Sequence, residues 1–297
     1  MMEEIGRYVK CSMHLLIIRI KKEFLIVALL RKSFGEVKIL VPKFSEKYSV
    51  YNSKRILKKM KKYNVQNIVL NDELVKNREF CTILQENQKY VVTGKRIGKV
   101  LLPKILEDVS IYAKYTIEKM KVVLLMNEYS IENLDLIECI SKEVKQLSVV
   151  SKNHTRFEKT SNRLFERYGY SIKLYDNSMK GFKRDNVIIN IDFKEDELKN
   201  MLLPKFGIII SLNEKINNLR KNFDGIIIND IDILGDGIPN ENFRKLSVCE
   251  AKLYRPLRKI RDNERVFFTE RYKINGYIGK NGKITQEEFE KVGKNYV

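Results

Sequence analysis

Polar side chains follow most of the short apolar runs in this sequence, at points where strands would end. They are Asn71 and Asp72, Asn127 and Glu128, Asn153, Asp176 and Asn177, Asn190 and Asp192, and Asn229 with Asp230 and Asp232. In an open parallel sheet the carboxyl ends of the strands face one edge, where ligands usually bind. Amide and carboxylate oxygens there could hold a small ligand or a hard cation such as Mg²⁺. The alternative is that Asn and Asp favour turns between strands and loops, and this interpretation needs no ligand.

Histidine and cysteine are too sparse to indicate a soft-metal site. The two histidines are His14 and His154, and the cysteines, Cys11, Cys81, Cys139 and Cys249, are far apart in sequence and form no C-x-x-C pair. We therefore expect no bound metal and a reducing, cytoplasmic location. His154 could act as a general base at the edge of a sheet, or it could pack as a loop residue beside Thr155.

The middle of the chain alternates between short apolar strands and amphipathic helices, which predicts a mostly parallel sheet covered on both faces. The first of these helices should begin near Ser130. The second should run from Arg156 to Tyr168, with a Thr155–Glu158 capping box before it and Gly169 after it. The predicted strands are 122–126, 147–150, 172–175, 187–191, 207–212 and 225–229.

The regions on either side of this alternation are less regular. Apolar runs at 15–20, 24–30 and 37–41 predict a short meander, followed by a helix at 53–63 and a strand at 67–70. A long helix is predicted over 100–120, with Pro103 in its first turn. After residue 240 we expect a helix, a basic aromatic stretch to Tyr272, a turn formed by Gly276, Gly279 and Gly282, and a last helix at 286–292. The fold class expected is α/β, with a basic module at 1–99, a Rossmann-like domain at 100–238 and a helical tail at 239–297 that packs back on the body.

Two motifs resemble the NADP-binding domain of the shikimate dehydrogenase and glutamyl-tRNA reductase type. The first is Asn153-His154-Thr155 after the second strand, which is similar to an Asn-Arg-Thr loop of that family, and the second is Val187-Ile-Ile-Asn190, which is similar to its Ile-Asn-Ala strand end. The resemblance implies a Rossmann fold and makes Lys152, Asn153, Thr155, Arg156 and Asn190 candidate cofactor ligands. In composition the chain also resembles proteins of clostridia, a likeness that implies no activity.

The same resemblance fails at the loop that matters most for a dinucleotide. Where the family has a glycine-rich turn, this chain has Met126-Asn127-Glu128-Tyr129-Ser130. Glycines there allow backbone amides to approach the pyrophosphate, and Glu128 would place a negative charge beside it. We therefore expect no cofactor, with NADP as the alternative.

Positive charge is concentrated outside the central domain. The net charge is +19, and residues 1–100 hold 22 Lys and Arg against 9 Asp and Glu. This distribution fits two interpretations, an anionic partner that is either a nucleic acid or an acidic protein, and a lysine-rich surface that is merely solvated. Candidate nucleic-acid contacts are Lys54, Arg55, Lys58, Lys62, Arg258 and Arg261. Charged residues interrupt the apolar stretch at 13–30, so no transmembrane segment is expected.

The function expected from the sequence is that of a degenerate Rossmann-like protein with a non-catalytic binding or regulatory role. The first alternative is an NADP-dependent oxidoreductase of the shikimate dehydrogenase type. The second is a nucleic-acid-binding protein that uses its basic flanks.

Overall fold

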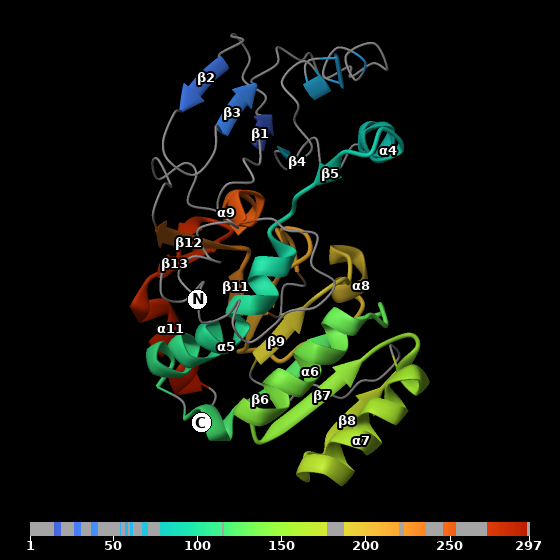
Figure 1. The fold of residues 1–297 in the computed structure, drawn as a ribbon. Coiled ribbons are helices and arrows are strands. Elements are labelled where there is room, and N and C mark those ends of the chain that lie inside the picture. The colour runs from blue at the N-terminus through green and yellow to red at the C-terminus, as the bar shows by residue number, and fades with distance from the viewer. Residues whose placement is uncertain are drawn as a thin grey trace, which may run out of the picture. The chain divides into compact units, whose positions relative to one another are not determined.

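The computed structural model describes residues 15–18, 27–30, 37–40, 54, 57–58, 60–61, 67–70, 78–114, 116–176, 187–219, 223–235, 246–253 and 272–295. The chain divides into two compact units (Figure 1). Unit 1 comprises Met1–Arg96 and Gly235–Arg255, and unit 2 comprises Ile97–Leu234 and Pro256–Val297. No helix in the described ranges is long and apolar enough to span a membrane.

Unit 1 contains a five-stranded sheet in the order β2-β3-β1-β4-β5. The strands are β1 (Leu15–Ile18), β2 (Val27–Leu30), β3 (Val37–Leu40), β4 (Asn67–Leu70) and β5 (Tyr90–Val91), and the helices of this unit include α4 (Arg78–Glu86) and α9 (Leu246–Leu253). The predicted meander is wrong, because β1 lies parallel to both β3 and β4, and β2 pairs antiparallel with β3. Apolar runs indicate buried strands but do not determine which strand pairs with which.

A helix lies between β3 and β4, as the sequence predicted. Lys54, Leu57, Lys58, Met60 and Lys61 all have helical backbone. Met60 is fully buried and Leu57 half-buried, whereas the three lysines are exposed. Met60 therefore faces the core of unit 1, Leu57 lies at the border, and the lysines point to solvent.

Unit 2 contains a six-stranded sheet in the order β11-β10-β9-β6-β7-β8 (Figure 1). Its strands are β6 (Lys121–Leu125), β7 (Gln146–Val150), β8 (Ile172–Tyr175), β9 (Val187–Asn190), β10 (Ile208–Ser211) and β11 (Ile226–Ile228). Every pair of neighbouring strands is parallel. If β6 is counted as strand 1 and the sheet is read from β8 to β11, the order is the 3-2-1-4-5-6 of the Rossmann fold. The predicted Rossmann-like α/β class is therefore confirmed.

The central strands are apolar because both faces of the sheet are covered. All four residues of β9 and of β10 are buried, as are four of the five in β6. Val123, Ile188 and Ile209 lie in register on adjacent strands and belong to one core cluster. Helix α8 (Glu195–Lys199) contributes Leu198 to the same cluster, so it covers that face of the sheet.

The long helix α5 (Lys95–Tyr112) begins earlier than predicted. Pro103 therefore lies in its interior and not in its first turn. Gly94 precedes the helix with a φ of +86°, and the Glu250 carboxylate accepts a hydrogen bond from the Arg96 N–H at 2.8 Å. Because Glu250 is 154 residues away in sequence, local periodicity could not reveal this start.

The helices that follow β6 and β7 begin in different ways. Helix α6 (Ile131–Glu143) begins where the sequence predicted, and Ser130 is its N-cap, whose side chain accepts a hydrogen bond from the Asn133 N–H. Helix α7 (Glu158–Tyr168) follows a 3₁₀ turn, η2 (His154–Phe157), and its N-cap residue makes no side-chain cap. The predicted Thr155–Glu158 capping box is therefore wrong, although Gly169 ends the helix in the left-handed conformation as expected.

The C-terminal segment contains strands where a helical tail was predicted. Strand β12 (Asp230–Gly235) pairs with β13 (Tyr272–Gly279), which forms an antiparallel hairpin with β14 (Gly282–Lys283). Helix α11 (Gln286–Asn295) follows, so the predicted last helix exists but is longer. Gly276 and Gly279 lie within β13 and Gly282 begins β14, so the turn itself consists of Lys280 and Asn281, flanked by the paired Gly279 and Gly282.

An aromatic cluster joins this hairpin to the rest of unit 2. The Tyr277 ring lies 6.3 Å from that of Tyr112 and 5.8 Å from that of Phe289, centroid to centroid. The Tyr277 hydroxyl donates a hydrogen bond to Asp108 at 2.9 Å. Burial, together with the nearby Asp108 carboxylate, raises the pKa of Tyr277 far above its usual range. The neutral phenol of Tyr277 therefore anchors the hairpin to Asp108 on α5.

Candidate functional site

The carboxyl ends of β6 and β9 mark the point where the strand order of the Rossmann-like sheet reverses. Open α/β sheets usually bind ligands in the crevice at this position. Asn127 lies just beyond β6, and Asn190 is the last residue of β9. We therefore take the turns that follow these two strands as the candidate site.

The turn between β6 and α6 is held by a carboxylate from the β9 side. Asp192 accepts hydrogen bonds from the Asn127 N–H at 2.8 and 2.9 Å, one to each of its oxygens. Its Oδ2 also accepts the Glu128 N–H at 2.9 Å. Two consecutive backbone amides of the turn thus point at an anionic group that belongs to the chain itself.

Side chains of the turn complete this arrangement. The Asn127 side-chain oxygen accepts the Lys152 N–H at 2.9 Å, which ties the turn after β6 to the loop after β7. The buried Asn133 side chain donates to the Glu128 carbonyl oxygen at 2.7 Å. Sequence reasoning expected Glu128 to oppose a phosphate here and placed Asp192 at a strand end, but it did not predict that Asp192 accepts the amides of this turn directly.

Tyr129 packs against residues of the neighbouring loop. Its ring meets that of Phe157 edge-on, with 5.2 Å between centroids. The Arg156 guanidinium lies 5.3 Å from the centroid of the Tyr129 ring. Arg156, a candidate for cofactor binding, is therefore stacked beside the turn and also exposed to solvent.

Asn190 is fully buried and organises the turn after β9. Its side-chain oxygen accepts the Phe193 N–H at 2.9 Å, and its amide donates to the Phe193 carbonyl at 3.0 Å and to the Ser211 hydroxyl at 3.3 Å. The Ser211 hydroxyl in turn donates to the Glu214 carbonyl at 2.8 Å. These contacts use the hydrogen-bonding groups of Asn190 within the fold, so its predicted contact with a cofactor gains no support here.

The other four candidate cofactor ligands lie together on the loop after β7. Lys152, Asn153, Thr155 and Arg156 are all exposed. The Lys152 ammonium is paired with Glu197 at 2.5 Å. Burial acts to raise the pKa of Glu197, but the hydrogen bonds from Lys152 and the Lys194 N–H outweigh it and lower that pKa.

His154 and the strand-end amide Asn229 lie near these turns with different roles. His154 is half-buried in η2, and its Nδ1 is a buried atom without a hydrogen-bond partner in the described part of the chain. The Asn229 side chain accepts the Ile216 N–H at 2.9 Å and donates to the Ile216 carbonyl at 3.0 Å. Asn229 thus closes a loop, as the turn-forming interpretation of these polar residues predicts.

Glutamates hold the remaining loops at this edge. Glu195 accepts the N–H groups of Asn217 and Asn218 at 3.2 and 3.1 Å, and Glu214 accepts the Glu195 N–H at 2.7 Å. Burial opposes ionisation of Glu195, but those amides and Lys199 prevail and lower its pKa. Across the described residues, no group of three or more His, Cys, Asp or Glu is arranged to hold a metal ion.

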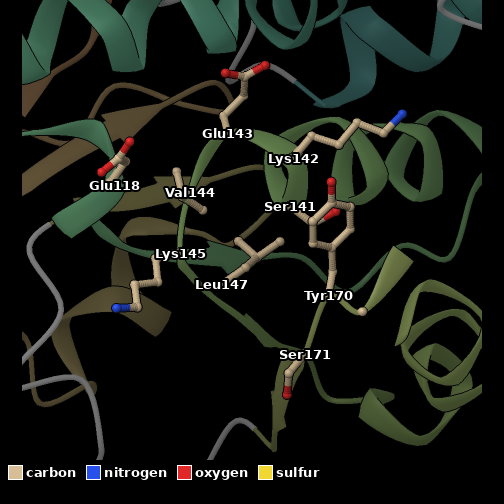
Figure 2. A pocket seen from close by; sticks show the side chains of 10 residues that line it. Glu118, Ser141, Lys142, Glu143, Val144, Lys145, Leu147, Tyr170 and Ser171 are labelled. Atoms are coloured by element: carbon tan, nitrogen blue, oxygen red, sulfur yellow. The ribbon is translucent and has the colours of Figure 1, made fainter. Parts of the chain in front are cut away.

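A hollow of about 450 Å³ opens at the opposite end of the strands (Figure 2). Val144, Lys145 and Leu147 line one side of it, with Tyr170 and Ser171 across from them. These residues lie at the amino ends of β7 and β8, away from the edge where Rossmann ligands bind. The lining also includes Lys142, Glu118 and Glu143, so cations and carboxylates are mixed in it.

The structure describes two of the six candidate nucleic-acid contacts, Lys54 and Lys58. Lys54 and Lys58 are exposed on the helix between β3 and β4. Arg55, Lys62, Arg258 and Arg261 lie outside the described residues, as do His14, Asn71, Asp72 and Asn177.

Comparisons with known proteins found no family model and no curated protein sequence that matches this chain. Solved structures that resemble it include L-tryptophan dehydrogenase from Nostoc punctiforme, at 11% identity and a TM-score of 0.31 over 96% of this chain and 79% of that one. Another is a chorismate mutase/shikimate 5-dehydrogenase fusion protein from Clostridium acetobutylicum, at 11% identity and a TM-score of 0.23 over 67% and 76%. Quinate dehydrogenase from Corynebacterium glutamicum in complex with NAD matches at 10% identity and a TM-score of 0.25 over 67% and 79%. Likeness at this level carries no argument about activity.

Proposed function

We propose that the Rossmann-like domain of this chain is a non-catalytic binding or regulatory module that works without a dinucleotide. One observation carries the proposal: the Asp192 carboxylate accepts the Asn127 and Glu128 amides at 2.8 to 2.9 Å. In dinucleotide-binding Rossmann domains the amides of this turn face the pyrophosphate, at the N-terminus of the following helix. Here an internal anion takes their hydrogen bonds.

Charge repulsion strengthens the case against a pyrophosphate in this turn. A phosphate near the two amides would face Asp192 and the exposed Glu128. Two unit negative charges about 5 Å apart repel by about 3 kcal/mol at an effective dielectric constant of about 20. That energy corresponds to a loss of about 100-fold in affinity.

The alternative function, an NADP-dependent oxidoreductase, is favoured by a different observation. Lys152, Asn153, Thr155 and Arg156 are exposed on one loop, after the second strand of the sheet. In Rossmann domains that bind NADP, a cation close to this position accommodates the 2′-phosphate. Against it, Lys152 already forms an ion pair with Glu197.

Thermal unfolding in the presence of NAD, NADH, NADP or NADPH separates the two functions. A ligand at about 100 times its Kd stabilises a protein by about 2.7 kcal/mol, which is a readily measured shift in Tm. We expect no shift with any of the four dinucleotides. A shift with NADP or NADPH that disappears in the Lys152→Ala/Arg156→Ala variant would overturn the proposal and show the cofactor binding that the oxidoreductase alternative requires. The matched control is Lys159→Ala/Arg163→Ala, which removes two exposed cations from the neighbouring α7.

A further inference from the structure

The basic charge of this chain is concentrated in one of its two units. Unit 1 holds 25 Lys and Arg against 12 Asp and Glu, a net charge of +13 in 117 residues. Unit 2 holds 32 against 26, a net charge of +6 in 180 residues. Lys and Arg are almost as frequent in unit 2 as in unit 1, but unit 1 has fewer Asp and Glu to balance them, so its net charge is twice that of the larger unit. Unit 1 is therefore where an anionic partner would be attracted.

Within unit 1, three lysines share one side of a helix. Lys54, Lys58 and Lys61 are exposed, and Met60 on the other side is fully buried. At 1.5 Å per residue, Lys58 and Lys61 lie about 6 and about 10 Å along the axis from Lys54. Residues four and three positions apart are neighbours on a helix surface, so these ammonium groups form a continuous row, here called the lysine face.

The lysine face presents charge and not apolar surface. On its helix the apolar Met60 is buried and Leu57 is half-buried, so the lysines are what the helix offers to a partner. Membrane insertion and hydrophobic protein interfaces need exposed apolar anchors, and an anionic partner fits a row of ammonium groups better.

We propose that unit 1 binds the phosphate backbone of a nucleic acid duplex through the lysine face. A duplex carries one negative charge per about 1.7 Å of its axis, so a row of ammonium groups about 10 Å long meets several phosphates. Lysine acts as a mobile point charge that needs no fixed geometry, which suits contacts to the backbone without sequence preference. The proposal goes beyond the function proposed for the Rossmann-like domain and uses none of its residues.

Binding of this kind has a measurable dependence on salt. Each phosphate contact contributes about −0.9 to the slope of log affinity against log salt concentration for B-DNA. The three lysines together contribute about −2.7. Between about 50 and about 200 mM salt they therefore account for about 40-fold of the loss in affinity.

The experiment measures fluorescence anisotropy of labelled DNA and RNA duplexes of mixed sequence with the full chain over a series of salt concentrations. The variant is Lys54→Gln/Lys58→Gln/Lys61→Gln, and its matched control is Lys119→Gln/Lys145→Gln/Lys173→Gln, which removes three exposed lysines from unit 2. We expect the first variant to bind more weakly and to have a slope smaller by about 2.7, and the control to behave like the unchanged protein. Thermal unfolding of both variants checks that the substituted proteins remain folded.

Three results would overturn the proposal. The first is that neither duplex binds at low salt. The second is that the control variant loses as much affinity as the first, because the attraction would then come from net charge and not from the lysine face. The third is that poly-glutamate or phosphatidylserine vesicles compete with the duplex at equal charge concentration, since the partner class would then be an acidic protein or a membrane surface. The result of the dinucleotide experiment on the Rossmann-like domain is independent of all three.

Discussion

Substituting Asp192 by alanine should loosen the turn between β6 and α6. The carboxylate of Asp192 accepts two backbone amides, those of Asn127 and Glu128, through three contacts of 2.8 to 2.9 Å. Alanine has no acceptor, so both amides would have to find water. Asn127 is half-buried and Glu128 is exposed, so the Asn127 amide should lose more.

The expected cost follows from the charge of the acceptor. A hydrogen bond to a charged group contributes about 1.5 to 3 kcal/mol, and water can replace part of this at an exposed amide. For one half-buried and one exposed donor we expect a loss of about 2 kcal/mol in the free energy of unfolding. In a domain of this size that lowers Tm by about 6 °C. The Asp192→Asn variant keeps one acceptor oxygen and should lose about half as much.

Two measurements test this prediction. Thermal unfolding gives the change in Tm, and amide hydrogen exchange reports directly on Asn127 and Glu128, whose protection should fall in the Asp192→Ala variant. The matched control is Asp196→Ala, because the Asp196 side chain is 90% exposed and forms only surface ion pairs such as that with Lys199 at 3.0 Å. Exposed pairs contribute about 0 to 1 kcal/mol. If both alanine variants melt alike, or if exchange at Asn127 is unchanged, the carboxylate does not hold this turn.

Two further predictions concern how the C-terminal hairpin and α11 are anchored. Tyr277→Phe removes the donor to Asp108 and should cost about 1 kcal/mol at neutral pH. Burial, and to a smaller extent the charge of Asp108, raises the pKa of Tyr277 in the folded protein above the value of about 10 in the unfolded chain. The neutral phenol therefore contributes its full stabilisation below about pH 10. Stability should therefore fall as the pH rises beyond about 10, and urea denaturation should show a shallower fall in Tyr277→Phe; equal slopes would contradict this. Gly293→Ala would place a Cβ atom 2.0 Å from the Ala113 carbonyl oxygen and should cost about 3 kcal/mol. Gly169→Ala, which has open space but a φ of +73°, should cost about 1 kcal/mol, so thermal melts in the reverse order would refute the clash.

The sequence predicted the elements whose signals are local. The strands of the Rossmann-like sheet are short apolar runs because both of their faces are buried, and β9 and β10 were recognisable on that basis. The start of a helix near Ser130 and its end at Gly169 in the next helix were recognisable, because each residue acts on backbone groups within a few residues of itself.

Contacts between distant residues defeated several predictions. The strand β1 joins β3 and β4 in parallel, and α5 begins at Lys95 beside a carboxylate 154 residues away. The Thr155–Glu158 pair matched a capping box in spacing, but a 3₁₀ turn precedes α7 and places neither residue at its N-cap. Spacing within one segment cannot report which other segment supplies the partner.

The candidate site divides in the same way. The sequence by itself determined that the turn after β6 lacks glycine and that Asn127, Asn190 and Asp192 stand at strand ends, because these are facts of composition and order. Only the tertiary structure decided what those residues do. Parallel pairing of β6 with β9 brings Asp192 across 65 positions of sequence to the amides of the first turn. The group that the Asp192 carboxylate contacts depends on which strands lie side by side. No local pattern could therefore distinguish a carboxylate that accepts the backbone amides of this turn from one that binds an external ligand.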